Sequence, residues 1–182
     1  AMLGNVALWK PSNTQLYSAW EGMKLLEAAG LPPGVVNFLP GNGADVGDLV
    51  MTHPDLAGLH FTGSTKTFQH LWKTIGENID KYKTYPRIVG ETGGKDFIIA
   101  HPSAEPQAVA IAIIRGAFEF QGQKCSAASR MYIPRSMWSQ VKSTLETEIP
   151  KMKQGCVTDF NNFISAVIDE RAFKKHQEYL DV

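Results

Sequence analysis

The sequence predicts an α/β fold built on parallel strands, and three observations support this prediction. Short runs rich in β-branched and aromatic residues alternate with segments whose apolar residues recur at helical spacing. The turns between them are short, which is typical of consecutive strand–helix–strand units. The composition is globular, since 43% of the 182 residues are hydrophobic and 20% are charged.

The first half of the chain contains three strands of this kind. Each is a short apolar run bounded by glycine, proline or polar residues, and a segment with helical spacing follows it. The expected strands span residues 6–10, 35–39 and 58–62.

The helices that follow these strands have recognisable ends. Ser12, Asn13 and Thr14 are candidates for the N-cap of the first helix, and Gly30 ends it. A glycine-rich turn opens a second, short helix that stops before Pro54. The third helix has one apolar face, formed by Phe68, Leu71, Trp72, Ile75 and Ile79.

The second half predicts a further α/β unit, with strands at residues 96–100 and 131–133. Ser103 is expected to cap a helix that begins near Pro106 and is apolar almost all round, so this helix should lie at the centre of its domain. The last predicted helix carries Trp138, Val141 and Leu145 on one face.

Glycines at positions 90, 93 and 94 mark the best candidate for a domain boundary. We therefore expect a first domain over residues 1–92 and a second over residues 93–182. The opening residues lead straight into a strand, which suggests a piece of a longer protein.

Composition also excludes several classes of function. Lys+Arg and Asp+Glu balance at 18 each, so neither a nucleic-acid surface nor an acidic-membrane surface is predicted. The apolar stretches are too short to cross a bilayer. Two cysteines give no disulfide framework, which favours a reducing compartment, and the five histidines show no metal-ligand spacing.

Cys125 and Glu91 are the most informative candidates for catalytic residues. Cys125 lies in Gly-Gln-Lys-Cys-Ser (residues 122–126), where its neighbours are polar or small, whereas a core cysteine would have apolar flanks. Glu91 is followed closely by two glycines. The pair suggests a thiol nucleophile and its base. The alternative is a buried structural thiol, the commonest fate of a free cysteine, and Cys156 is taken as incidental.

The turn Phe-Thr-Gly-Ser-Thr at residues 61–65 is a candidate anion site. A strand ends there, Gly63 permits close approach of the backbone, and Ser64 and Thr65 open a helix whose free N–H groups favour an anion. The alternative is an ordinary N-cap.

Two further features point to the same edge of the sheet. Glycines 41, 43 and 47 resemble a dinucleotide loop, but the spacing is one residue longer than the usual fingerprint and suits an ordinary turn equally well. Lys10 precedes Pro11 at the carboxyl end of a strand, where ligands of open α/β sheets bind. Taken alone, such a lysine is more often merely solvated.

Together these residues resemble the aldehyde dehydrogenase superfamily. The resemblance rests on four ordered segments, at residues 10–12, 61–64, 91–95 and 122–125. Segments 118–127 and 163–169 are most similar to the branch that oxidises glutamate γ-semialdehyde to glutamate in proline catabolism.

The resemblance implies a Rossmann-like NAD-binding portion joined to part of an α/β catalytic domain. It implies that Cys125 attacks the aldehyde to give a thiohemiacetal, and that hydride then leaves for NAD. Glu91 would activate the water that hydrolyses the resulting thioester. Lys10 would hold the adenosine ribose, the Cys125 N–H would form half of an oxyanion hole, and Ser126 would border the aldehyde pocket. The pyrophosphate would lie against Gly63, Ser64, Thr65, Lys66 and Thr67.

The resemblance also implies a small-molecule aldehyde as substrate, a homodimer or higher homo-oligomer, and the mitochondrial matrix. Asn13 stands where many members carry an acidic residue that repels a 2′-phosphate, so the preference for NAD over NADP stays open. The asparagine of the oxyanion hole and the glutamate that holds the nicotinamide ribose are expected outside the chain. The 182 residues alone are therefore expected to be inactive.

Three other functions remain open from the sequence. Cys125 and Glu91 suit another aldehyde dehydrogenase, such as one for succinate semialdehyde, equally well. A non-catalytic α/β module with a structural Cys125 is the second alternative. A thiol hydrolase is disfavoured because no histidine falls in a context that pairs it with Cys125.

Overall fold

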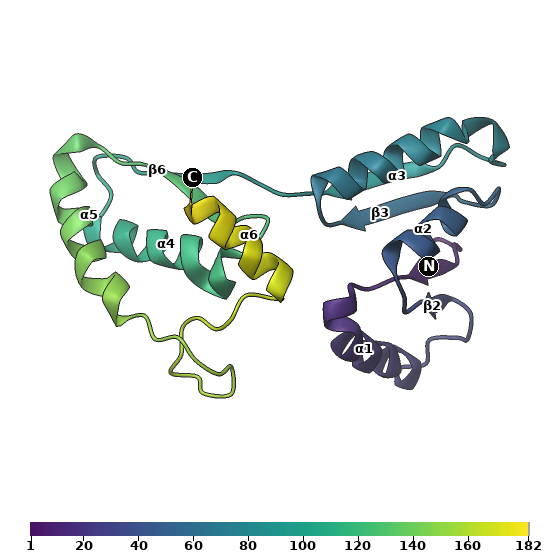
Figure 1. The fold of residues 1–182 in the computed structure, drawn as a ribbon, viewed down its shortest axis with the longest axis horizontal. Helices are drawn as coiled ribbons and strands as arrows, with labels where there is room; N and C mark the ends of the chain where they lie inside the picture. The colour runs from purple at the N-terminus through teal and green to yellow at the C-terminus, as the bar shows by residue number, and fades with distance from the viewer. Residues whose placement is uncertain (182) are drawn as a thin grey trace. The chain divides into compact units, whose positions relative to one another are not determined.

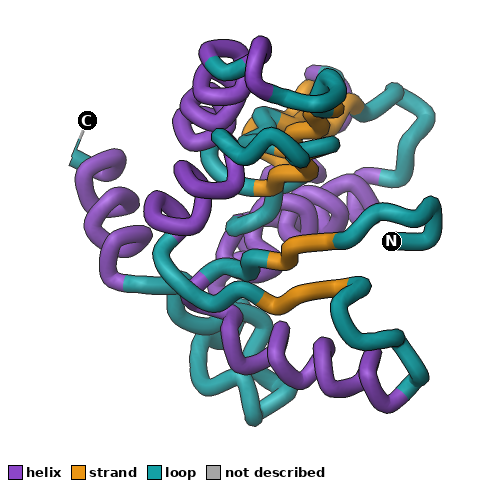
Figure 2. The backbone as a smooth tube through the Cα atoms, turned by 90° about the vertical axis from the view of Figure 1, so that its right-hand side faces the viewer, coloured by secondary structure: helices purple, strands orange, loops and turns teal. Residues whose placement is uncertain are grey.

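The computed structural model describes residues 1–181, which divide into two compact units, Ala1–Gly90 and a second that begins at Glu91 (Figure 1). The strands of both units are short, and helices make up most of the regular structure (Figure 2). None of the helices within residues 1–181 has the length and apolar character needed to span a membrane.

The first unit opens with a parallel strand–helix–strand unit, as predicted. Strand β1 (Ala7–Trp9) pairs in parallel with β2 (Val36–Phe38), and helix α1 (Leu16–Ala28) connects them. The rings of Trp9 and Phe38 meet edge to face, with centroids 5.7 Å apart. The aromatic contact fixes the two strands at their carboxyl ends, the edge that carries the predicted ligand-binding turns.

The rest of this unit holds a second strand pair with two helices. Strand β3 (Gly58–Thr62) pairs with β4 (Arg87–Glu91), and helices α2 (Gly43–Met51) and α3 (Thr65–Glu77) lie before and after β3. Ile75 of α3 is almost fully buried, at 2% exposure. Phe68 and Leu71 of the predicted apolar face are half-buried, whereas Trp72 is 57% exposed, so the face packs only in part.

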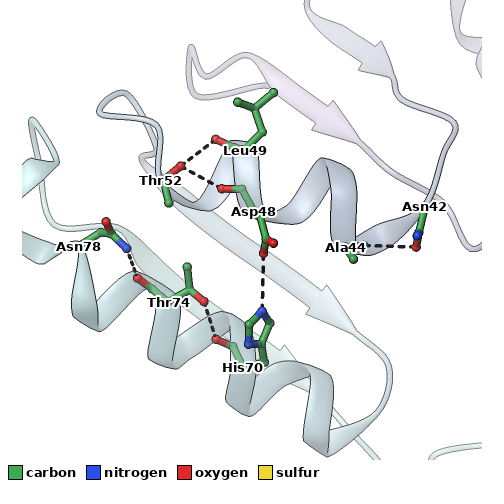
Figure 3. A network of polar contacts seen from close by, with 8 residues as sticks. All are labelled: Asn42, Ala44, Asp48, Leu49, Thr52, His70, Thr74 and Asn78. Atoms are coloured by element: carbon green, nitrogen blue, oxygen red, sulfur yellow. Dashed lines mark hydrogen bonds and ion pairs between the residues drawn. The ribbon is translucent and has the colours of Figure 1, made fainter.

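Helices α2 and α3 contact each other directly (Figure 3). Asp48 of α2 and His70 of α3 approach to 3.6 Å, and a Cβ on Gly47 would lie 3.9 Å from the Leu71 side chain, an ordinary contact distance. Ile79 was expected on the face of α3, but the helix ends at Glu77 and Ile79 begins a 3₁₀ turn.

The second unit repeats the parallel pattern. Strands β5 (Asp96–Ile99) and β6 (Ala128–Tyr132) pair in parallel, and helix α4 (Pro106–Phe118) connects them. Helix α5 (Arg135–Glu148) packs on α4. The core is formed by Ala110, Ile113, Met137 and Val141. The nearly all-apolar helix is therefore central in its unit, as predicted.

The predicted cap of α4 is wrong. Glu105 is the N-cap, because its carboxylate accepts from the backbone N–H groups of Gln107 (3.1 Å) and Ala108 (2.6 Å). Ser103 instead hydrogen-bonds to Nδ1 of His101, at 2.9 Å. A carboxylate that reaches two orphan N–H groups, and suits the positive end of the helix, displaces the serine two residues earlier.

Two elements of this unit differ from the prediction. Strand β6 begins at Ala128, three residues before the predicted strand at 131–133. Helix α6 (Glu170–Leu180) was not predicted; Asp169 caps it by accepting from the Ala172 N–H at 2.7 Å. This helix has no buried residue.

Candidate active site

Cys125 is the last residue of a turn with unusual backbone geometry, residues 119–125, which we call the nucleophile turn. Phe120, Gln121 and Gly122 all have positive φ, at 51°, 60° and 69°. For the two non-glycine residues this left-handed conformation costs about 1 to 2 kcal/mol each. Backbone strain of this kind gathers at functional sites and persists only where surrounding contacts hold it. The Cys125 side chain at the end of the turn is exposed.

An ion pair closes the nucleophile turn on one side. Lys124 Nζ lies 2.7 Å from Oε2 of Glu119, and Arg115 lies 2.5 Å from Oε1, the other oxygen of the same carboxylate. The hydrogen bond from Lys124 lowers the pKa of Glu119 below its ordinary value, and Arg115 adds to this effect. The Lys124 ammonium also lies 5.2 Å from the centroid of the Phe120 ring. The residue before the nucleophile is therefore tied to the start of the turn.

Two glutamines attach the nucleophile turn to a distant part of the chain. Gln121 and Gln123 hydrogen-bond to the backbone of residues 165–168. Sequence analysis did not single out these side chains. The available signal was the run of polar residues around Cys125, which has no apolar periodicity and so no packing role of its own.

The segment that carries Glu91 passes directly against the nucleophile. Glu91 is the last residue of β4 and is exposed. A Cβ on Gly94 would overlap the carbonyl oxygen of Cys125 and lie 2.9 Å from Oδ2 of Asp96. The close approach of the two backbones thus explains why position 94 requires glycine.

Gly94→Ala is expected to destabilise the full-length protein by about 1 to 3 kcal/mol, because the methyl group meets a backbone carbonyl that cannot rotate away. Gly93→Ala is the matched control, since a Cβ there has no atom within 4 Å and its φ is not positive. Its effect should stay within about 0.5 kcal/mol. Urea unfolding measures the free energy of unfolding of both variants. Equal values would contradict the close approach of the Gly94 and Cys125 backbones.

The turn at residues 61–65 has the geometry of an N-cap that leaves donors available. Ser64 caps α3: its hydroxyl accepts from the Thr67 N–H at 3.1 Å and lies 2.8 Å from the Thr67 hydroxyl. Within the described chain, the N–H groups of Thr65 and Lys66 donate to no protein acceptor. The capping interpretation therefore holds for the side chain, while two N–H groups of the first turn can still meet an anion.

Lys10 lies beside the glycine turn that follows β2. Its Cε is 3.7 Å from the position of a Cβ on Gly43, the first residue of α2, and its ammonium donates to the Pro11 carbonyl at 2.8 Å. Gly41 has φ +142°, a conformation that favours glycine. Because β1 and β2 are parallel, their carboxyl ends bring this lysine and this turn to one edge.

Cys156, taken as incidental from the sequence, is also exposed, and a hydrogen bond with the Thr158 hydroxyl, at 3.1 Å, lowers its pKa below the ordinary value. Ser126, predicted to border the aldehyde pocket, is exposed immediately after the nucleophile.

Across residues 1–181, no three histidine, cysteine or acidic side chains come close enough to share a metal ion.

Comparison with known proteins identifies the family. The sequence matches the aldehyde dehydrogenase family over residues 1–182. The chain belongs to the aldehyde dehydrogenase family. Its fold agrees with aldehyde dehydrogenase structures, which confirms the α/β architecture predicted from the sequence.

Within the aldehyde dehydrogenases, two curated relatives and one crystal structure illustrate what this chain is similar to. The mitochondrial delta-1-pyrroline-5-carboxylate dehydrogenases of Dictyostelium discoideum and Rattus norvegicus are 50% and 46% identical to this chain over all of its length. A crystal structure of the Mycobacterium tuberculosis enzyme bound with NAD is 51% identical, with a TM-score of 0.94 over 99% of the chain. The chain spans 33%, 32% and 34% of these three proteins, respectively.

Proposed function

We propose that this chain is part of an NAD-dependent aldehyde dehydrogenase that oxidises glutamate γ-semialdehyde, formed by ring opening of 1-pyrroline-5-carboxylate, to glutamate. The packing of Gly94 against the Cys125 carbonyl carries the proposal, because it brings the Glu91 segment to the nucleophile turn. The shared name of relatives that align with the whole chain supports the choice of substrate.

In the proposed reaction, the Cys125 thiolate adds to the aldehyde carbon, and the carbonyl oxygen becomes the oxyanion of a thiohemiacetal. The backbone N–H of Cys125 makes no hydrogen bond within the described residues, so it can donate to that oxygen. Loss of hydride from the same carbon leaves a thioester. Glu91 then takes a proton from water, the hydroxide adds to the thioester carbon, and the thiolate of Cys125 leaves with glutamate as the product.

The first unit supplies residues that suit a dinucleotide. The N–H groups of Thr65 and Lys66 at the start of α3 suit the pyrophosphate, with Gly63, Ser64 and Thr67 completing the turn. Lys10, beside Gly43, suits the hydroxyls of the adenosine ribose. Bound NAD supplies the acceptor for the hydride.

Ser64→Asp in the full-length protein is expected to raise the Michaelis constant for NAD by about 10²-fold, because a carboxylate would face the pyrophosphate. Ser64→Asn is the matched control: asparagine and aspartate cap helices about equally well, so the pair differs only in charge. Steady-state kinetics at fixed aldehyde measures both. Equal NAD constants for the two variants would remove this turn from the cofactor site.

The substrate is tested with the full-length protein by NADH production from pyrroline-5-carboxylate and from succinate semialdehyde. We expect the value of kcat/KM for pyrroline-5-carboxylate to exceed the other by at least about a hundredfold, the size of discrimination that a site with matched polar groups readily reaches. A preference for succinate semialdehyde would move the protein to another branch of the family.

Assembly and location complete the proposal. A homodimer or higher homo-oligomer follows from the family resemblance, and light scattering of the full-length protein at working concentration tests it. The mitochondrial matrix is supported by the names of several relatives, and imaging of the full-length tagged protein in its own cells tests it. A monomer, or a signal outside mitochondria, would contradict the respective part.

A further inference from the structure

Gln121 and Gln123 connect the nucleophile turn to residues 165–168 through three hydrogen bonds. The Gln121 amide is used at both ends: Nε2 donates to the Ala166 carbonyl at 2.6 Å, and Oε1 accepts from the Ser165 N–H at 3.2 Å. Oε1 of Gln123 accepts from the Ile168 N–H at 3.0 Å. The partners lie 44 or 45 residues further along the chain, so these contacts are tertiary.

Apart from the ion pairs of Glu119 and the Lys124 ammonium near the Phe120 ring, the bonds at the left-handed residues lie within the nucleophile turn itself. The Gln123 N–H donates to the Phe120 carbonyl at 3.1 Å, and Nε2 of Gln123 donates to the same oxygen at 3.2 Å. These bonds close the turn on itself but do not fix its direction. Gln121, at φ +60°, lies in the strained part, and its side chain makes the contact outside the turn.

The partner segment is itself anchored, so it can serve as a fixed support. The two residues just before it are joined to residues 153–155. The Phe163 N–H donates to the Lys153 carbonyl at 2.9 Å, and the Gly155 N–H donates to the Ile164 carbonyl at 3.1 Å. Gln154 also donates through Nε2 to the Ser165 carbonyl, at 3.3 Å. Its other end leads into Asp169, the cap of α6.

We propose that Gln121 and Gln123 are positioning residues, which hold Cys125 in its reactive position by fixing the nucleophile turn to residues 165–168. Cys125 is two residues beyond Gln123, so a change in the direction of the turn moves its thiol and its N–H together. A displacement of about 1 Å at a reacting group can cost about 10²-fold in rate. The inference rests on the proposed function, in which Cys125 is the nucleophile.

The experiment compares three glutamine variants of the full-length protein. Gln121→Met and Gln123→Met keep the side-chain length but remove the amide contacts to residues 165–168, and Gln123→Met also removes the bond from its Nε2 to the Phe120 carbonyl. Gln154→Met is the matched control, because it removes a contact to the same segment without touching the nucleophile turn. In Gln121→Met and Gln123→Met we expect kcat to fall by about tenfold to a hundredfold, with an unchanged Michaelis constant for NAD. In the control we expect kcat to stay within about twofold of wild type.

Hydrogen exchange gives a readout that does not depend on turnover. In Gln121→Met and Gln123→Met, peptides that cover residues 119–127 and 163–169 should both exchange about tenfold faster, whereas Gln154→Met should affect only residues 163–169. If Gln121→Met fails to fold, Gln123→Met carries the comparison.

Two results would overturn the proposal. One is a kcat within about twofold of wild type in both variants, and the other is an equal loss of kcat in Gln154→Met. Failure of the proposed function is a separate result: in that case the wild-type protein produces no NADH from pyrroline-5-carboxylate.

Discussion

Cys125→Ala is expected to abolish NAD reduction by the full-length protein, because no other side chain of the nucleophile turn can form a thioester. Cys125→Ser should also be nearly inactive, since a hydroxyl is a far poorer nucleophile near neutral pH. Enzymes accelerate reactions by about 10⁶-fold or more, and most of that factor should be lost. Steady-state NADH production from pyrroline-5-carboxylate measures the loss.

Cys156→Ser is the matched control for this experiment. Cys156 is also exposed, and its pKa is lowered by Thr158, so it is the one other thiol of the chain that could compete as a nucleophile. Its substitution should leave NADH production within about twofold of wild type, as expected for a surface change away from the site. Turnover within about tenfold of wild type in Cys125→Ala would contradict the nucleophile assignment.

Glu91→Gln is expected to separate the two half-reactions. Glutamine keeps the shape of the side chain but cannot take a proton from water, so thioester hydrolysis should slow by about 10²- to 10⁴-fold while hydride transfer continues. Rapid mixing should then show a burst of NADH, close to one equivalent per site, followed by a slow steady rate.

The control for Glu91→Gln is Glu178→Gln, an equally conservative change of a carboxylate on α6. It should show wild-type kinetics without a burst. The opposite pattern in Glu91→Gln, in which the hydride step collapses and hydrolysis stays fast, would mean that Glu91 is not the hydrolytic base.

The parts of the fold that follow from local pattern could be predicted from the sequence. Strand β3 has the predicted bounds of 58–62, and the buried face of α4 follows from its apolar residues. Helix α6 was not predicted, although Ala172, Phe173, Tyr179 and Leu180 recur with a helical period; the helix buries none of these residues. The cap of α4 was missed because Ser103 and Glu105 both suit an N-cap, and only the path of the chain decides between them.

The candidate site could likewise be predicted only in part from the sequence. Residue types and their order indicated Cys125, Glu91 and the turn at Ser64, because these chemistries need particular side chains next to glycine. The reasons for that geometry are tertiary and could not be seen in the sequence. Gly94 is required by the Cys125 carbonyl, and the left-handed Gln121 is held by residues 165–168, more than 40 positions away.

The most direct test of the central claim traps the thioester. Full-length Glu91→Gln protein is mixed with NAD and pyrroline-5-carboxylate, quenched in acid and digested, and the cysteine-containing peptides are analysed by mass spectrometry. We expect a glutamyl group on the peptide that contains Cys125, absent when NAD is omitted and absent from the peptide that contains Cys156. An unmodified Cys125 peptide, recovered from a sample that has produced its burst of NADH, would contradict the account.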